Sequence, residues 1–500
     1  MEHLKAMQSI YTLFFVLTLQ VGFAQTYNVT TFGAKGDGKT LNTRAIQTAI
    51  DRCFSQGGGE VIVPAGKYYT GTLFLKSRVY LHLMPGAVIQ GSSNPLDYPE
   101  YNILAAKKFS TIIHNGLFVE TMKALIIADQ AEQVGIIGKG TVQGSGDAAV
   151  FKLGVNTDGR PKNLFFLRCT DVLLRDVHIL NAAQITISVS GCKKVNLDGI
   201  FVQSKFNYNC DGIDVDAQDV TISNCIIDSE DDALCFKSEY LDKFCENISV
   251  SNCVISSLCN AIKLGTGSRA GFRNITVNNC VVKKPSFKFQ RWKMTPNIVH
   301  LPDTQSVNCG IVVLGVDGGL VENIHFSNIV MTDVLSPIFV RVGKRFLNPD
   351  QQPSVMRNIS IHNIRAECRS IIPSIIAGLE ESPIEQLELS DLQISIVIAV
   401  GADSLKTIPS IIPENLKGYP ENRQTFGMKL PSNAFYVRHV KGLSMRNITV
   451  HYPDTEARPT FYFDDTKAIK LKNVLLNGHY LETKPALLVQ KDSEAIEVIH

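Results

Sequence analysis

One short string of residues recurs along most of this chain, and its spacing limits the folds that the chain can adopt. Three copies align residue for residue as apolar, polar, apolar, polar, Asn and Cys, at 220–225, 248–253 and 275–280. Related strings begin at residues 172, 195, 324, 359, 387, 443 and 469. Alternation with a period of two residues indicates β-strands, and each unit is too short to contain a crossover helix.

The repeat predicts an all-β fold of one kind, a right-handed parallel β-helix in which like residues of successive coils stack. We expect the Asn of each string to occupy a tight corner and to bond the backbone of the next coil. A solenoid grows along one axis and needs no internal boundary, so we predict a single domain over residues 25–500. Wider gaps between repeats predict loop insertions at 283–306 and 399–434.

The N-terminal part of the chain differs from the repeat. A helix is predicted to start near Asn42 and to end at the glycines 57–59. Its apolar face has helical spacing and consists of Ala45, Ile46, Ala49, Ile50 and Cys53. We expect this helix to cover the open end of the solenoid, so that residues 25–95 form an N-terminal cap and the first coils.

Residues 1–24 are predicted to be a signal peptide and not part of the fold. Lys5 supplies a positive start, residues 10–21 are a short apolar run, and Gly22 and Ala24 are small residues at the positions that a signal peptidase reads. We therefore expect an exported protein, secreted or periplasmic, cleaved near Ala24. No later segment approaches about 18 uninterrupted apolar residues, so we expect no membrane span.

The twelve cysteines are predicted to be buried thiols. Cys225, Cys253 and Cys280 occupy the apolar position where other repeats carry Ile or Val, so we favour unpaired small apolar residues over a disulfide framework. A metal site is less favoured still, because no C-x-x-C pair or His cluster accompanies them. The formal net charge of +2 indicates neither nucleic acid nor a membrane surface as a partner.

Two acidic signatures lie about one coil apart in the middle of the repeat, at 209–212 and 230–233. Stacked coils would bring Asp211, Asp231 and Asp232 to one face, where a glycosidase needs a carboxylic acid and a carboxylate that holds water. Crowded carboxylates also separate in pKa, which keeps one of them protonated. Asp-Gly and Asp-Asp are turn signals as well, so either signature alone would favour a plain corner.

Further segments accompany these signatures: Phe-Gly-Ala-Lys-Gly-Asp-Gly at 32–38, and those at 59–68, 75–83 and 86–91. Together they resemble the polygalacturonase family, family 28 of the glycoside hydrolases. The resemblance implies inverting hydrolysis of a pectic or related cell-wall polysaccharide or oligosaccharide, with no cofactor and no metal. It also implies that Asp231 is the general acid and that Asp211 and Asp232 position and activate the water.

Two motifs of that family are missing from this chain. Asn260 stands where the family has the His of Gly-His-Gly. The segment 310–314, Gly-Ile-Val-Val-Leu, lacks both cations of the family's Arg-Ile-Lys, which grips a galacturonate carboxylate. Lys237 and Lys263 occupy similar positions in successive coils and are candidates to replace this clamp, although a lysine on an outer strand face is more often merely solvated.

The substrate-binding candidates are therefore Asn209 of the first acidic motif, Lys237, Asn260, Lys263 and Trp292. Trp292, the only Trp of the chain, lies among cations and aromatic residues in the first insertion. This composition suits stacking on sugar rings and equally suits a solvated basic loop. The second insertion is a candidate to close one end of a groove and to make an enzyme exo-acting.

The leading hypothesis is an exported inverting glycoside hydrolase. A polysaccharide lyase on the same fold, with Lys237 or Lys263 as its base, is one alternative. A non-catalytic glycan-binding β-helix is the other. The residues leave open the sugar and linkage, internal or terminal cleavage, a uronate or a neutral sugar at the cleaved bond, and the oligomeric state.

Overall fold

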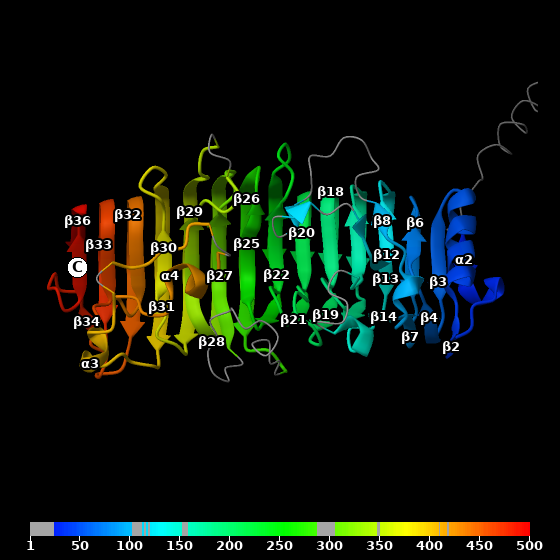
Figure 1. The fold of residues 1–500 in the computed structure, drawn as a ribbon, viewed down its shortest axis with the longest axis horizontal. Helices are drawn as coiled ribbons and strands as arrows, with labels where there is room; N and C mark the ends of the chain where they lie inside the picture. Colours follow the sequence, from blue (N-terminus) through cyan, green and yellow to red (C-terminus); the bar gives the residue numbers. More distant parts are fainter. Residues whose placement is uncertain are drawn as a thin grey trace, which may run out of the picture.

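The computed structural model of the protein describes residues 25–102, 113–114, 117–118, 121–152, 159–287, 306–347, 351–409, 411–417 and 420–500. Its strands wind into one long parallel β-helix that runs from helix α2 at one end to strand β36 at the other (Figure 1). The coils take the right-handed sense of parallel crossovers. The predicted fold class is therefore confirmed. The predicted signal peptide, 1–24, lies outside the described residues.

Parallel pairing arranges the strands in three long sheets, one on each side of the coil. Strands confined to sheet 1 are β1 (Thr26–Asn28), β3 (Gly59–Val63), β6 (Val79–Leu83), β13 (Glu132–Gly138), β16 (Thr170–Arg175), β23 (Cys245–Ser251) and β36 (Glu494–Ile499). Strands confined to sheet 2 are β2 (Asp37–Leu41), β4 (Gly66–Thr70), β7 (Ala87–Gly91), β14 (Thr141–Gln143), β17 (His178–Leu180), β19 (Phe201–Ser204), β21 (Ile226–Ser229) and β24 (Val254–Ser257).

Sheet 3 carries the acidic signatures at its edge. Its own strands are β5 (Leu73–Leu75), β12 (Ala124–Asp129), β15 (Lys162–Leu167), β22 (Leu234–Ser238), β25 (Asn260–Ser268), β27 (Val307–Gly315), β30 (Ser374–Ala377) and β35 (Leu488–Lys491). Longer strands bend around corners and belong to two or three sheets: β18 (Ile187–Asp198), β20 (Ile213–Ser223), β26 (Gly271–Lys283), β28 (Leu320–Val342), β29 (Val355–Cys368), β31 (Ile384–Ile396), β32 (Phe435–His451) and β33 (Phe461–Leu476).

Shorter elements lie at the ends and in the connections. The antiparallel pieces are β8 (Tyr101–Asn102) with β11 (Thr121–Met122), β9 (Ile113–His114) with β10 (Leu117–Phe118), and β34 (His479–Tyr480) on β33. The helices are α2 (Thr43–Ser55), α3 (Ala402–Leu405) and α4 (Asn422–Phe426), and the 3-10 turns are η1 (Val29–Phe32), η2 (Pro95–Asp97) and η3 (Ala149–Phe151). No helix of the described ranges is both long and apolar enough to cross a membrane.

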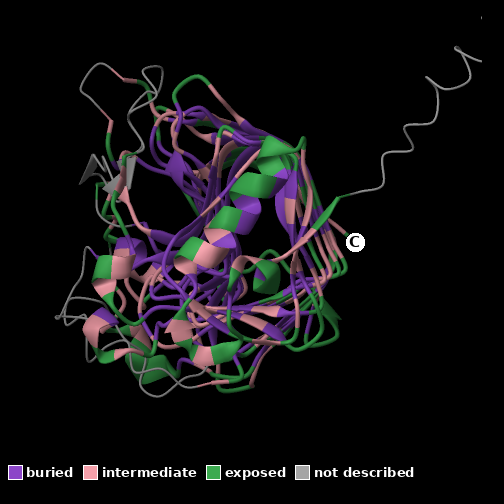
Figure 2. Cartoon of the chain, turned by 90° about the vertical axis from the view of Figure 1, so that its right-hand side faces the viewer, coloured by how far each residue is buried: buried purple, intermediate pink, exposed green. Residues whose placement is uncertain are grey.

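Helix α2 covers the N-terminal end of the coil, as predicted. It buries Ile46, Ala49, Ile50 and Cys53 against the first coils. The end-on view shows α2 lying across the opening, with its buried side turned to the interior (Figure 2). Burying this apolar stripe closes a solenoid end that would otherwise expose its core.

The repeated Asn residues form ladders at the corners between sheets. Asn279, Asn328 and Asn363 have left-handed backbone angles, with φ of 52°, 57° and 49°. Asn328 Nδ2 donates to Asn279 Oδ1 at 3.2 Å, and Asn363 Nδ2 donates to Asn328 Oδ1 at 2.7 Å. The predicted tight corner is present, but the expected partner was wrong: each amide bonds the equivalent amide of the neighbouring coil and not its backbone. Asn suits this position because it tolerates the left-handed conformation.

Replacing Asn328 with Ala is expected to lower the free energy of unfolding by about 1–2 kcal/mol, the cost of placing a Cβ-bearing residue without local side-chain bonds in the left-handed region. Asn328→Gly removes the same amide but accepts a φ of 57°, so a smaller loss is expected. Urea denaturation of the two variants measures this difference. Equal losses for Ala and Gly would mean that the backbone conformation is not what selects Asn.

All twelve cysteines are free thiols in the structure, and all but Cys259 are buried. Cys225, Cys253 and Cys280 fill the predicted slot of three successive coils and lie in the apolar core. Each donates its thiol to a backbone carbonyl two residues earlier, as Cys225 does to Ser223 at 3.1 Å. The prediction of stacked, buried thiols in this slot is therefore confirmed.

The insertion at 399–434 folds back over the outer face of sheet 3. Its side chains Ile412, Phe426 and Leu430 form an apolar cluster with residues of β27, β28, β30 and β32; the sheet residues are Cys309, Val312, Leu314, Phe339, Ile375, Ala377 and Tyr436. Helix α4 of this insertion is drawn against these strands in Figure 1. The outer face of sheet 3 is thus covered over β27, β28, β30 and β32. Most of the insertion at 283–306 lies outside the described residues.

Candidate active site

The three predicted carboxylates lie at one edge of sheet 3, where neighbouring strands begin. Asp211 comes two residues before β20, and Asp232 and Asp231 come two and three residues before β22. These strands pair in parallel with Ile213 opposite Leu234, and Gly212 N–H donates to the Asp232 carbonyl at 2.9 Å. The stacking of two coils therefore brings residues about twenty positions apart to one place. All three aspartates are buried.

Backbone and amide groups hold the Asp231 carboxylate in place. Its Oδ1 accepts the Asp232 N–H at 2.9 Å, and its Oδ2 accepts Asn209 Nδ2 at 3.4 Å. Asn209 reaches it from a left-handed corner, with φ of 52°. The Asn of the first acidic signature thus orients an acidic side chain of the second.

Asp232 is held as an ionised carboxylate. Its Oδ2 accepts Lys263 Nζ at 2.8 Å, and its Oδ1 accepts Asn260 Nδ2 at 2.7 Å. Burial alone would raise its pKa, but Lys263 and then Lys237 outweigh burial and lower the pKa of Asp232 to about 2. Asp232 therefore carries its negative charge throughout the neutral pH range.

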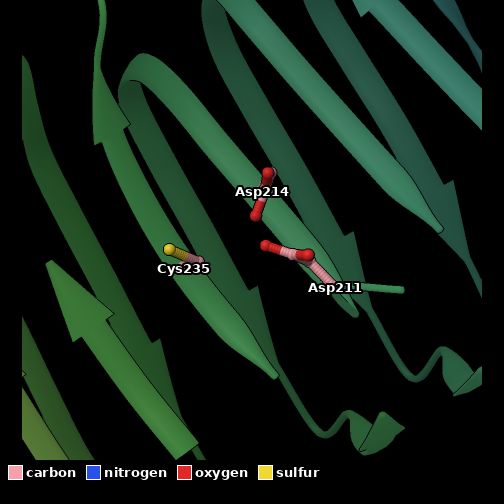
Figure 3. Close-up of side chains that lie close together, drawn as sticks. All are labelled: Asp211, Asp214 and Cys235. Atoms are coloured by element: carbon pink, nitrogen blue, oxygen red, sulfur yellow. The ribbon is translucent and has the colours of Figure 1, made fainter. Parts of the chain in front are cut away.

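A fourth carboxylate, Asp214, was missed by the sequence reasoning. It projects from β20 beside Asp211 and Cys235, and one ligand-type atom from each of the three lies within 4.8 Å of the others (Figure 3). Burial, and then Asp214 and Asp231, raise the pKa of Asp211 well above its usual value. Burial also raises the pKa of Asp214. A signal was present: Asp214 stands between the inward residues Ile213 and Val215, at an outward position of the alternation.

Two lysines balance the charge of Asp211 and Asp214. Lys237 Nζ lies 3.7 Å from an oxygen of Asp211 and 3.7 Å from an oxygen of Asp214. Lys162, which sequence reasoning also missed, donates to Ser188 at 3.0 Å, and burial lowers its pKa to about 8 against the pull of Asp214. An ammonium group thus stands where the two carboxylates would otherwise attract a cation.

The described residues contain two groups with metal-ligand chemistry. One is Asp211, Asp214 and Cys235, and the other is Asp231, Asp232 and Cys259. The first fits a metal poorly, because the Cys235 thiol donates to the Gly265 carbonyl at 3.0 Å and burial raises its pKa well above the usual value.

Glu421 reaches this site from the insertion at 399–434. Its Oε1 accepts Lys263 Nζ at 2.8 Å, and its Oε2 accepts Asn260 Nδ2 at 3.0 Å and Asn308 Nδ2 at 3.2 Å. Lys263 is 0 % exposed and lies between the carboxylates of Asp232 and Glu421. No local pattern in the sequence could have paired Glu421 with Lys263, because 158 positions separate them.

The predicted substrate-binding residues divide into two groups. Asn209, Lys237, Asn260 and Lys263 all lie beside the carboxylates, and their contact with a sugar stays a prediction. Asn260 and Lys263 are completely buried in this state. Trp292 lies outside the described residues.

The site and its scaffold match known families. A model described as "Glycosyl hydrolases family 28" matches residues 102–295, the segment that holds Asp211, Asp214, Asp231 and Asp232. Over this segment the chain is similar to family 28 of the glycosyl hydrolases. A second model, "Rhamnogalacturonase A/epimerase, pectate lyase-like", matches residues 26–96.

Named relatives and a solved structure are also similar to this chain. The chain is 30% identical over 271 residues to an exo-poly-alpha-D-galacturonosidase of Dickeya chrysanthemi, covering 44% of this chain and 43% of that protein. It is 29% identical over 223 residues to a probable polygalacturonase of Vitis vinifera, covering 43% and 45%. The match thus spans less than half of either relative. The family 28 exopolygalacturonase of Yersinia enterocolitica shares the fold, with a TM-score of 0.66 at 20% identity over 90% of this chain and 78% of that one.

Proposed function

We propose that this protein is a glycoside hydrolase of family 28 that cleaves glycosidic bonds of pectic polysaccharides or their fragments by inversion. The observation that carries the proposal is the edge of sheet 3, where a carboxylate held ionised by Lys263 lies beside carboxyls of raised pKa. An inverting glycosidase needs a proton donor and an ionised carboxylate together. The family 28 match over residues 102–295 and the names of the relatives support the same reaction class. Export through residues 1–24 is part of this proposal.

The resemblance to family 28 assigns distinct roles to two of the aspartates. Asp231 protonates the glycosidic oxygen, so that the bond to the anomeric carbon breaks as the leaving sugar takes the proton. Asp232 accepts a proton from a water molecule, whose oxygen attacks the anomeric carbon from the opposite face. Asp232 can act as the base because it is ionised at neutral pH, whereas Asp211 holds a proton more tightly than an ordinary Asp. Proton exchange with solvent then restores both groups.

We further propose that cleavage takes place at a chain end. The insertion at 399–434 covers the outer face of sheet 3 over β27, β28, β30 and β32. Its Glu421 contacts Lys263 and Asn260, the two residues that bond Asp232. A long glycan lying along sheet 3 would meet this wall directly after β25. The Dickeya relative is named as an exo-acting enzyme, which supports the same reading.

The proposal is tested by incubating the purified protein with oligogalacturonides and with rhamnogalacturonan oligosaccharides and separating the products by chromatography. We expect reducing-sugar release without a rise in ultraviolet absorbance, one small product from the start of the reaction, and an inverted anomeric configuration by proton NMR. An ultraviolet rise would instead indicate a lyase. Binding of a panel member without turnover would indicate a glycan-binding β-helix.

A further inference from the structure

The 399–434 insertion is fastened to the coil by a buried arginine of the sheet it covers. Arg341 of β28 donates through Nη1 to Thr425 Oγ1 at 2.9 Å and through Nη2 to the Asn415 carbonyl at 2.7 Å. The Phe426 ring packs edge-on against Phe339, with centroids 6.3 Å apart. Both sides of Glu421 in the chain are therefore anchored to the outer face of sheet 3, which holds the Glu421 backbone in a fixed place.

From this anchored position the Glu421 carboxylate contacts the groups that contact Asp232. Lys263 Nζ lies 2.8 Å from an oxygen of Asp232 and 2.8 Å from an oxygen of Glu421. Asn260 Nδ2 donates both to Asp232 Oδ1 at 2.7 Å and to Glu421 Oε2 at 3.0 Å. The insertion thus shares the two donors that set the orientation and charge of Asp232.

This sharing limits how strongly Lys263 neutralises Asp232. An ammonium paired with one buried carboxylate would concentrate its field on that group, whereas a second carboxylate at the same distance offsets part of the field. A general base loses strength as its pKa falls further below the working pH. The pair of contacts therefore keeps Asp232 ionised without making it a still weaker base.

We propose that Glu421 is a positioning residue: it fixes Lys263 and Asn260 in the arrangement in which both donate to Asp232, and it offsets the charge of Lys263. The inference rests on the proposed function only in taking Asp232 as the base. It gives the insertion a part in the reaction beyond that of a wall. It also assigns Lys263 to the protein's own carboxylates, and not to the carboxylate of a bound uronate.

Several charged and titratable groups surround the pair and enter any pH dependence. Those around Asp232 and Lys263 are Glu421, Lys237, Asp211, Asp214, Asp231, Cys235 and Cys259. Only Glu421 comes from the insertion. Removing its charge while keeping its size therefore isolates the contribution of the insertion from that of the coil.

The test compares Glu421→Gln with Glu414→Gln in the full-length protein. Glu414 is the matched control: it lies in the same insertion and is largely buried, but it pairs with Arg341 at 3.6 Å and Arg438 at 3.5 Å. For Glu421→Gln we expect kcat to fall about 10-fold or more with KM changed less than about 3-fold, and the acidic limb of kcat/KM to move to lower pH. Glu414→Gln is expected to keep kcat within about 2-fold and the limb in place.

A second readout does not depend on turnover. Carbon-13 NMR titration of labelled aspartates, with the Asp232 signal identified by its loss in Asp232→Asn, is expected to show a lower titration midpoint for Asp232 in Glu421→Gln. An unchanged midpoint in a folded variant would overturn the proposal. If the wild type cleaves no glycan, the proposed function fails while this titration still decides the role of Glu421. If Glu421→Gln does not fold, Glu421→Asp is used instead. Its side chain is one methylene shorter, which moves the carboxylate away from Lys263, and the titration midpoint of Asp232 must again be lower.

Discussion

Asparagine in place of Asp231 is expected to lower kcat by about 10²–10⁴-fold on any glycan that the wild type cleaves, the usual contribution of a positioned general acid. The amide keeps the size of the side chain, and its oxygen can still accept the Asp232 N–H, so the fold is expected to be unchanged. Its NH2 group cannot accept Asn209 Nδ2 as the carboxylate does, and the proton for the leaving oxygen is lost. Steady-state kinetics with chromatographic detection measures the effect, and circular dichroism checks the fold.

A leaving group that needs no proton identifies the lost step. An activated aryl glycoside of the cleaved sugar should be hydrolysed by Asp231→Asn with a much smaller loss than the natural substrate. Asp176→Asn serves as the control, because Asp176 lies on an exposed corner and pairs with Lys139; its kcat should match that of the wild type. If kcat fell by the same factor on both kinds of substrate, Asp231 would not be the general acid.

Replacing Lys263 with Met is expected to lower the free energy of unfolding by about 3–5 kcal/mol near pH 7, because it leaves two buried carboxylates without their shared cation. Lys263 is completely buried, and Asp232 and Glu421 are nearly so. Urea denaturation provides the measurement. The control is Lys470→Met, which removes an exposed pair with Glu497 and should cost no more than about 1 kcal/mol.

The loss in Lys263→Met should shrink as the solution becomes acidic. In the wild type the pKa of Asp232 is lowered from 3.8 to about 2, so its ion pair stabilises the folded state above pH 3.8 and loses this effect as the pH falls through 2. The variant lacks Lys263, which lowers the pKa of Asp232 more than Lys237 does. Asp232 of the variant therefore protonates at a higher pH. The difference in unfolding free energy between wild type and variant should therefore narrow between about pH 4 and pH 2. If the difference in unfolding free energy stayed constant across this range, the destabilisation of Lys263→Met would not arise from the charge of Asp232.

Local repetition explains how much of this molecule was predictable. The strands, the Asn corners and the stacking of Asp211 with Asp231 and Asp232 all follow from a pattern with a short period, which neighbouring coils simply copy. Asp214 was within reach of the same reasoning, since its outward position follows from alternation along β20.

Contacts made by the insertion were not predictable in this way. Lys263 stands on an outer strand position, where solvent is the usual surrounding, yet it is completely buried. Its burial depends on where residues far along the chain come to rest, and Glu421 bonds Asn260 across 161 positions. Apolar packing against Phe339 and Tyr436 decides that placement, and no periodic signal encodes it.

Because the coils stack at a regular spacing, the number of coils between two positions sets the distance between them. The insertion ends just before β32, which follows β27, β28 and β30 in sheet 3. It crosses these strands, and its Glu421 contacts Lys263 of β25. Neighbouring strands of a sheet are about 4.8 Å apart, so gaining or losing a single coil between β25 and β32 would carry the end of the insertion too far for a 2.8 Å contact. A coil gained near α2 would leave the contact intact. Coils can therefore be added near α2 without moving this contact, whereas the contact between Glu421 and Lys263 fixes the number of turns from β25 to β32.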